Sequence, residues 1–234
     1  MSIAENIAHV KERIRMAARR AGRNPDEITL MAVTKTFPAG LIREAYAGGI
    51  RVFGENRVQE FATKADAVRD LAEAEWHMIG HLQSNKAGKA AELFDAVDSV
   101  DSFRLAQRLD IPATQLRKTV KVLLEVNIGG EQAKSGLEPG SPELEQILRA
   151  AFQLTGLKIC GLMTVPPYSE DPEHARSCFR RLRELRERLA AQNFPSITLE
   201  TLSMGMSHDF EIAIEEGCTC VRVGTAIFGK RQKL

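Results

Sequence analysis

A lysine follows the first strongly apolar run of the sequence. If the run from Ile28 to Thr34 is a strand, alternation places Lys35 on the same face as Met31 and Val33. An amine at the mouth of an apolar tube is poorly solvated, which favours its neutral form and lets it form an imine with a carbonyl compound. Taken alone, Lys35 also fits a rim lysine whose charge reaches solvent. The rest of the sequence has to decide between these two readings.

The last apolar run of the sequence contains an arginine. Val221 and Val223 share a face that suits packing against helices, so Arg222 points the other way, toward the interior of a closed sheet. A guanidinium in such a place is costly unless something pairs with it. The partner is either a carboxylate on another strand, such as Glu125 or Glu200, or an atom of a bound ligand.

Two neighbouring segments near the end of the sequence have the residues of a phosphate site. Ser207 stands where it would cap a helix predicted over His208–Glu216, and Gly205 permits close approach of the backbone. Gly224 and Thr225 follow the last apolar run. Barrel enzymes frequently bind phosphate with the loops after strands seven and eight and an adjacent helix start. These residues therefore predict a site for a phosphate dianion.

Other apolar runs also end in polar residues. Asn56, after the second run, has the reach to hydrogen-bond a ring substituent, or it caps a helix. His81, after the third, is a general base or a residue that hydrogen-bonds at a helix start. With Lys35, these residues describe a site for a planar, phosphorylated carbonyl compound that forms an imine with the lysine.

These side chains converge only if the runs pair side by side. Eight runs rich in Val, Ile and Leu alternate with helix-like stretches, the clearest of which is Pro172–Gln192. The predicted strands are Ile28–Thr34, Arg51–Gly54, Trp76–Gly80, Leu93–Val97, Val120–Asn127, Leu157–Thr164, Ile197–Leu202 and Cys220–Val223. Alternation of this kind implies parallel pairing, and eight strands in 234 residues favour a closed barrel over an open sheet.

The predicted fold class is therefore α/β, a single (β/α)8 TIM barrel with an additional N-terminal helix. Helical spacing of apolar residues covers about 2–22, and the barrel covers about 28–230. Because no linker or low-complexity segment divides the chain, we expect residues 1–234 to form one domain.

Composition excludes several classes of protein. Lys and Arg number 32 against 31 Asp and Glu, so the strong basic excess of a nucleic-acid-binding domain is missing. The sequence has no run of about 18 apolar residues, and its N-terminus lacks the order of charges and apolar residues that marks a signal peptide. Its four cysteines are too few and too scattered for a disulfide framework or a zinc site. We therefore expect free thiols, no metal and a cytoplasmic location.

Six segments, in the right order and over nearly the whole chain, make the sequence resemble the pyridoxal phosphate homeostasis protein family. They are AVTKT at 32–36, FGENRVQE at 53–60, WHMIGHLQSNK at 76–86, GLMTVPP at 161–167, LSMGMSHDFEIAI at 202–214 and VRVGTAIFG at 221–229. One position departs from the family pattern, because the family usually has an aromatic residue where this chain has Arg57.

The resemblance implies the fold of the alanine racemase barrel domain, which eukaryotic ornithine decarboxylases share. It also implies that Lys35 holds the cofactor pyridoxal 5′-phosphate (PLP) as a Schiff base and that Arg222 faces the pyridine nitrogen. The other implied cofactor-binding residues are Ser207, Gly224 and Thr225 at the phosphate, with Ser203 and Asn56 close by.

A permanent cation near the pyridine nitrogen disfavours its protonation and weakens the ring as an electron sink. Racemases of similar fold work with such an arginine and use a tyrosine from an extra β domain of a partner subunit. This sequence supplies no such domain, and its tyrosines lie in a helix-like segment (Tyr46) and in a Pro-rich loop (Tyr168). We therefore expect a monomeric protein without catalytic residues that binds PLP and acts in vitamin B6 homeostasis, with PLP-dependent apo-enzymes as candidate recipients.

Two alternatives remain open. The first is a PLP-dependent amino-acid racemase, or a related one-domain PLP enzyme, that works with barrel residues alone. The second is a Schiff-base aldolase that uses Lys35 on a phosphorylated sugar.

Overall fold

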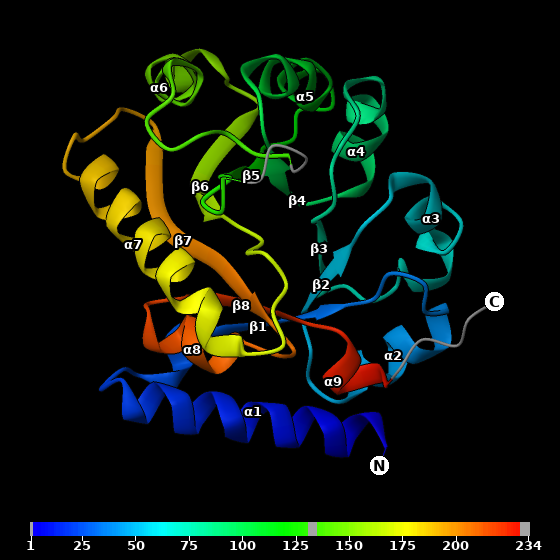
Figure 1. The fold of residues 1–234 in the computed structure, drawn as a ribbon. Helices are drawn as coiled ribbons and strands as arrows, with labels where there is room; N and C mark the ends of the chain where they lie inside the picture. Colours follow the sequence, from blue (N-terminus) through cyan, green and yellow to red (C-terminus); the bar gives the residue numbers. More distant parts are fainter. Residues whose placement is uncertain (1, 131–134, 230–234) are drawn as a thin grey trace.

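The computed structural model describes residues 2–130 and 135–229, and its eight strands form a closed parallel barrel in sequence order, with β8 pairing with β1 (Figure 1). The strands are β1 Thr29–Val33, β2 Val52–Glu55, β3 Glu75–Met78, β4 Ala96–Val100, β5 Val120–Glu125, β6 Leu157–Met163, β7 Ile197–Met206 and β8 Cys220–Val223. The predicted (β/α)8 fold is confirmed.

Helices before, between and after the strands surround the barrel, as Figure 1 shows. They are α1 Ile3–Arg20, α2 Ala39–Ala47, α3 Val58–Ala62, α4 Ala87–Leu93, α5 Phe103–Gln115, α6 Pro142–Ala150, α7 Arg176–Ala190, α8 Phe210–Glu215 and α9 Thr225–Phe228. Parallel strands need such crossovers, and the helices between the strands turn their apolar faces toward the outer face of the sheet.

The additional helix α1 lies outside the barrel and packs against α8 and α9. Ser2 and Glu5 form a capping box at its start, and Ile7, Val10 and Ile14 form its buried face. The helix was predicted over about residues 2–22, close to its observed extent. The predicted end of the barrel near residue 230 lies outside the described residues.

Alternation along the strands separates an inner from an outer layer of side chains. Val221 and Val223 are buried in the core between the strands and the helices, as predicted. Met31 of β1 stands opposite Arg222 of β8 in the parallel register, so both side chains face the barrel interior. The arginine is 4% exposed.

Two strands differ from their predicted extents by three residues or more. The predicted strand Leu93–Val97 begins at Ala96 and runs to Val100, and α4 occupies the residues up to Leu93. The predicted strand Ile197–Leu202 continues to Met206. Both strands continue through buried polar residues, Asp98 in β4 and Ser203 in β7, which looked like loop residues in the sequence.

Composition predicted free thiols and no membrane-spanning segment. Cys160, Cys178, Cys218 and Cys220 are all free thiols, as expected. Within residues 2–130 and 135–229, we find no helix that has both the length and the apolar character needed to cross a membrane.

Candidate functional site

Lys35 lies two residues beyond the end of β1, at the carboxyl end of the barrel. Its side chain is half-buried, and Nζ donates to Oδ1 of Asn56 at 3.5 Å, which joins the ends of β1 and β2. Of the two alternatives for Asn56, the helix cap is wrong, because Arg57 is the residue before α3 and no side chain caps that helix. Asn56 instead packs where Gly80 follows β3, since a Cβ on Gly80 would overlap the backbone of Asn56.

The two neighbours of Lys35 in the chain are held by a buried ionic cluster, Glu55, Glu60 and Lys64. Thr34 donates from Oγ1 to Glu55 at 2.6 Å, and its carbonyl accepts from Lys64 at 3.1 Å. Lys64 also pairs with Glu55 at 2.9 Å and with Glu60 at 3.1 Å. The sequence reasoning missed this cluster.

Thr36 adopts a left-handed conformation with φ of 70°, which is uncommon for a β-branched residue. Its amide donates to Glu60 at 2.5 Å. Backbone strain of this kind persists only where the surroundings hold it. The ionic cluster therefore fixes the course of the chain on both sides of Lys35.

Arg222 is hydrogen-bonded inside the barrel by neutral oxygen atoms. Nη1 donates to Ser203 Oγ, and Nη2 donates to the Thr164 carbonyl, each at 2.8 Å. The salt bridge to Glu125 or Glu200, one of the two alternatives for this arginine, is not among the ion pairs of the described residues. Glu200 instead lies near the amino ends of the strands. Ser203, which the resemblance implies is a cofactor-binding residue, thus accepts a hydrogen bond that orients the arginine.

The predicted phosphate residues meet at the ends of β7 and β8. The oxygen Oγ of Ser207 accepts from the amide of Ala226 at 3.4 Å, so the segment after β7 touches the first turn of α9. Gly224 lies beside Val33 of β1, because a Cβ there would stand 3.4 Å from the Val33 carbonyl. Thr225 is exposed at the start of α9.

One local role of Ser207 is wrong. The residue before α8 is Asp209, whose side chain accepts from the Met206 amide at 2.6 Å, so Ser207 does not cap that helix. The extension of β7 to Met206 moves the turn and leaves the Ser207 hydroxyl facing α9. Gly205, with φ of 87°, permits α8 to pack against β7, since a Cβ there would overlap Ala213.

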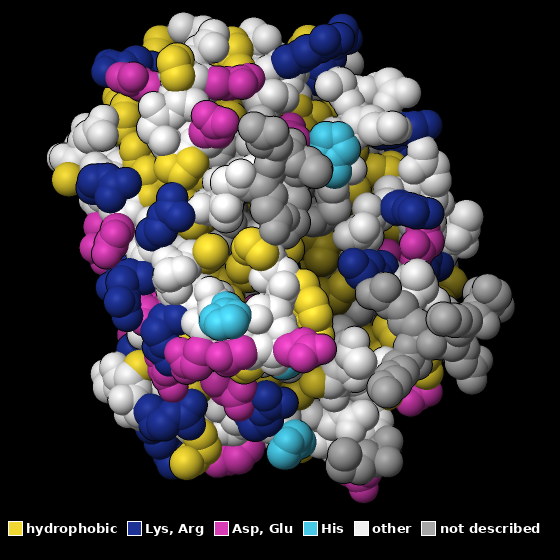
Figure 2. Space-filling view, viewed as in Figure 1, with side chains coloured by type: hydrophobic (Ala, Val, Ile, Leu, Met, Phe, Trp, Pro, Cys, Tyr) yellow, Lys and Arg dark blue, Asp and Glu magenta, His cyan; other side chains and the backbone are white. Residues whose placement is uncertain are grey.

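The rim beyond Asn56 holds a cavity of about 270 Å³ that Arg57, His81 and Lys86 help to line. His81 hydrogen-bonds Asp101 through Nδ1 at 3.0 Å. Tyr168 is 83% exposed in its loop, as predicted for a rim residue, and its ring lies 6.1 Å from that of His208. Figure 2 shows hydrophobic side chains in a hollow near the middle of the molecule, over the strands of the barrel.

Glu125 is a further buried group at this end of the barrel. It ends β5, and its Oε1 accepts from Ser135 at 3.2 Å. Its Oε2 is buried and has no hydrogen-bond partner within the described residues. Burial raises the pKa of this carboxyl, and the nearby charge of Arg222 opposes the rise. From the sequence, Glu125 was predicted only as a possible salt-bridge partner of Arg222.

The structure thus brings Lys35 and Asn56 together at the ends of β1 and β2. It brings Ser203 and Arg222 together inside the barrel, and Ser207, Gly224 and Thr225 together after β7 and β8. Because β8 pairs with β1, these groups share one end of a single barrel. Such an end combines an amine, a buried cation and a set of hydroxyl and amide donors.

Comparisons with known proteins show which family the chain belongs to. Residues 6–232 match the family model described as alanine racemase, N-terminal domain. A pyridoxal phosphate homeostasis protein of Aquifex aeolicus is 46% identical over 232 residues, which are 99% of this chain and 100% of the relative. A protein of the same name from Pseudomonas aeruginosa is 46% identical over 230 residues, or 98% and 96% of the two chains.

Among solved structures, PipY of Synechococcus elongatus PCC7942 with PLP bound is similar, with a TM-score of 0.85 and 40% sequence identity. The match covers 97% of this chain and 100% of PipY. The family model matches nearly the whole chain, and the relatives are 46% identical over nearly their full length. This sequence identity shows a shared family and not only a shared fold. The chain therefore belongs to the pyridoxal phosphate homeostasis protein family, whose members are built on the alanine racemase N-terminal domain.

Proposed function

We propose that this protein binds PLP at the carboxyl end of its barrel and holds it as a Schiff base on Lys35, without turning over a substrate. It acts in this proposal as a monomer in the cytoplasm, where it keeps the cofactor in reserve for PLP-dependent apo-enzymes. The cofactor-binding residues are Lys35, Asn56, Ser203, Ser207, Arg222, Gly224 and Thr225.

One observation carries the proposal. The guanidinium of Arg222 is buried beside the strand that leads to Lys35, and its described partners are the neutral oxygens of Ser203 and Thr164. A buried charge is costly unless acceptors compensate it. A pyridine nitrogen with a free lone pair is an acceptor that suits this donor.

The other groups fit the remaining parts of the cofactor. An aldehyde condenses with the Lys35 amine to an imine and water, and Asn56 is placed to hydrogen-bond a ring substituent beside that bond. The hydroxyls of Ser207 and Thr225 and the amides after β8 are donors for a phosphate dianion. PLP has all three features, and its ring supplies an electron sink when bound.

The charge of Arg222 also supports the proposal that the protein does not turn over a substrate. With a permanent cation at the pyridine nitrogen, the ring stays unprotonated and stabilises a carbanion poorly. A racemase needs acid–base groups on both faces of its substrate. Tyr46 lies in α2 under the guanidinium of Arg51, and Tyr168 points from an exposed loop, so neither is positioned by packing against the site.

The test is the visible absorbance of the purified protein after loading with PLP and removal of free cofactor. The wild type is expected to show imine absorbance, and borohydride is expected to fix one cofactor mass on the chain. Lys35→Ala should show neither. Lys89→Ala, which removes an exposed lysine of α4, is the matched control and should behave as the wild type. Absorbance that persists in Lys35→Ala would disprove the covalent site, and a colourless protein that cleaves sugar phosphates would favour the aldolase.

Glu125 favours one second candidate, an amino-acid racemase or related one-domain PLP enzyme. A buried carboxyl with a raised pKa and an unpartnered oxygen among the described residues is suited to proton transfer. This function predicts rapid exchange of the α-hydrogen of an amino acid in deuterated water. The exchange would depend on Lys35 and fall by about 100-fold or more in Glu125→Gln. No exchange above the buffer rate supports the carrier.

A further inference from the structure

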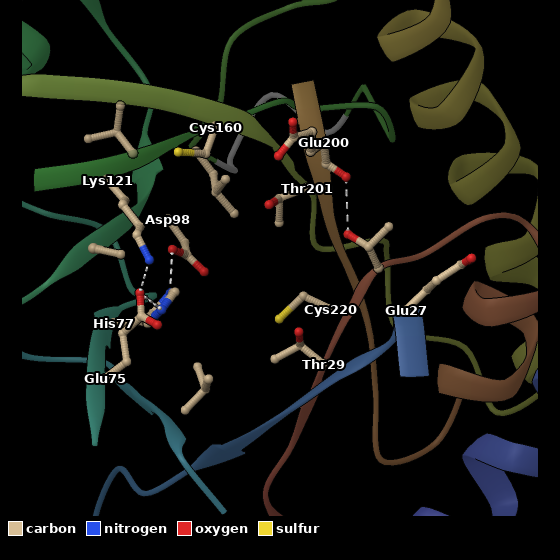
Figure 3. A pocket seen from close by; sticks show the side chains of 15 residues that line it. Glu27, Thr29, Glu75, His77, Asp98, Lys121, Cys160, Glu200, Thr201 and Cys220 are labelled. Carbon is tan, nitrogen blue, oxygen red and sulfur yellow. Dashed lines mark hydrogen bonds and ion pairs between the residues drawn. The ribbon is translucent and has the colours of Figure 1, made fainter. Parts of the chain in front are cut away.

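A second cavity, of about 420 Å³, opens at the other end of the barrel (Figure 3). Thr29, Glu75, Ala96 and Cys220 line it, and each is the first residue of its strand. The cavity therefore lies at the amino ends of the strands, away from Lys35. Neither the proposed cofactor nor any residue assigned to it accounts for this cavity.

A chain of alternating charges forms one side of the cavity. His77 donates from Nδ1 to Asp98 Oδ1 at 2.9 Å and lies 3.5 Å from Glu75 through Nε2. Glu75 also pairs with Lys121 at 2.6 Å. Burial of the imidazole opposes its protonation, but the carboxylates of Asp98 and Glu75 outweigh burial and raise the pKa of His77. Both cations of this side are therefore engaged by carboxylates.

One oxygen of these charged side chains has no hydrogen-bond partner among the described residues. Asp98 has a side chain that is 1% exposed, and its Oδ2 is buried without a hydrogen bond among the described residues. In Figure 3 this oxygen points away from His77, toward the middle of the cavity. An unsatisfied buried acceptor costs about 1–3 kcal/mol, and more when it is charged. A donor on a ligand would remove this cost.

The opposite side of the cavity carries Glu27 and Glu200 (Figure 3). Glu200 forms no ion pair within the described residues, and Glu27 lies 3.9 Å from Arg23. Aliphatic side chains, those of Val52 and Leu123 among them, lie on the wall. Four carboxylates face two cations. The charges of Glu75, Asp98, His77 and Lys121 balance, so the excess of negative charge lies on the side of Glu27 and Glu200. Its carboxylates and thiols form no group of three metal ligands in the described part of the chain.

We propose that the amino end of the barrel binds a small aliphatic diammonium compound. One ammonium group donates to Asp98 Oδ2, and the other lies between Glu27 and Glu200, with the methylene chain against the aliphatic wall. Charge-assisted hydrogen bonds of this kind are about twice as strong as neutral ones, and burial of the methylene groups adds to them. The ligand site is separate from the cofactor site and stands without it.

Calorimetric titration with 1,4-diaminobutane at constant ionic strength tests the proposal. The full chain is first treated with borohydride, so that the amine cannot react with a bound aldehyde. Asp98→Asn is expected to weaken binding at least tenfold, and Glu200→Gln several-fold. Glu145→Gln, which removes an exposed carboxylate of α6, is the matched control and should leave the affinity unchanged. Lys35→Ala should also bind the diamine as the wild type does, whatever the outcome for PLP.

Three results would overturn the proposal. The first is no heat of binding with 10 mM diamine. The second is equal binding of 1,4-butanediol, which has the same length without charge. The third is wild-type affinity in both Asp98→Asn and Glu200→Gln. If Asp98→Asn loses its far-UV circular dichroism, Glu200→Gln decides alone, because its side chain lies at the exposed rim.

Discussion

Arg222 is the residue whose surroundings matter most for the chemistry of the site. Two hydrogen bonds to neutral oxygens fix the plane of its guanidinium and leave its charge for a ligand. The alternation of Val221 and Val223 predicted its direction, because packing against helices requires that face to be apolar. Its partners were not predictable, since one of them is the backbone carbonyl of Thr164, which any residue type supplies.

Arg222→Gln is expected to keep the imine but change its titration. Without the permanent cation, the pyridine nitrogen is protonated more easily, so the visible spectrum should change with pH at higher pH values than in the wild type. PLP should also bind about tenfold more weakly, because a charged donor is lost. Spectra recorded across a pH series measure both effects, with Arg108→Gln on α5 as a control. An unchanged titration would mean that Arg222 does not face the ring.

Short elements, rather than single residues, hold Lys35 in place. The strand end of β1, the turn at Thr36 and helix α3 meet around the cluster of Glu55, Glu60 and Lys64. Burial raises the pKa of the Glu55 carboxyl, and the charge of Lys64 opposes that rise. The cluster therefore depends on all three elements being in register.

Lys64→Met should destabilise the protein by about 3–5 kcal/mol, because it leaves Glu55 buried without its cation. Urea unfolding measures the loss, and the double variant Lys64→Met/Glu55→Gln should recover part of it. Arg43→Met is the control, since the Arg43–Asp70 pair is exposed and such pairs contribute little to stability. Equal losses in the two single variants would contradict a buried role for Lys64.

The elements also show where sequence reasoning stops. Apolar runs located all eight strands, since a strand buried on both faces needs such a run. They placed β4 wrongly because Asp98 and Ser99 look like the end of a strand, yet inside the fold Asp98 Oδ1 accepts from His77 and Ser99 donates to the Gly80 carbonyl. The cluster around Lys64 was also missed, because its contacts join segments that are separate in the sequence. Ion pairs between segments depend on spatial neighbours that no local pattern reveals.

At the scale of the whole molecule, the barrel has two polar ends with an inner layer of side chains between them. The carboxyl end is built from residues that follow the strands, and the amino end from residues that begin them. At the amino end, His77, Glu75, Asp98 and Lys121 connect β3, β4 and β5. This group links the global stability of the barrel to pH.

The pKa of His77 is raised to about 10, above its ordinary value of 6.5. Its contribution to stability is therefore complete below pH 6.5 and is lost as the pH rises toward 10. A rise from 6.5 to about 10 corresponds to a loss of at most about 5 kcal/mol. The free energy of unfolding, from urea titrations between pH 6 and 10, should fall more steeply for the wild type than for His77→Gln. His9→Gln, on the exposed face of α1, should follow the wild type; parallel curves for wild type and His77→Gln would refute the assignment.

The pairing of β8 with β1 also has a consequence for synthesis of the chain. A ribosome produces Lys35 well before Arg222, and the strand that carries the arginine is the one that closes the ring. A nascent chain therefore displays the reactive amine long before it has the rest of the pocket. Incomplete or truncated chains should not retain the cofactor, so that only finished molecules draw on the free pool.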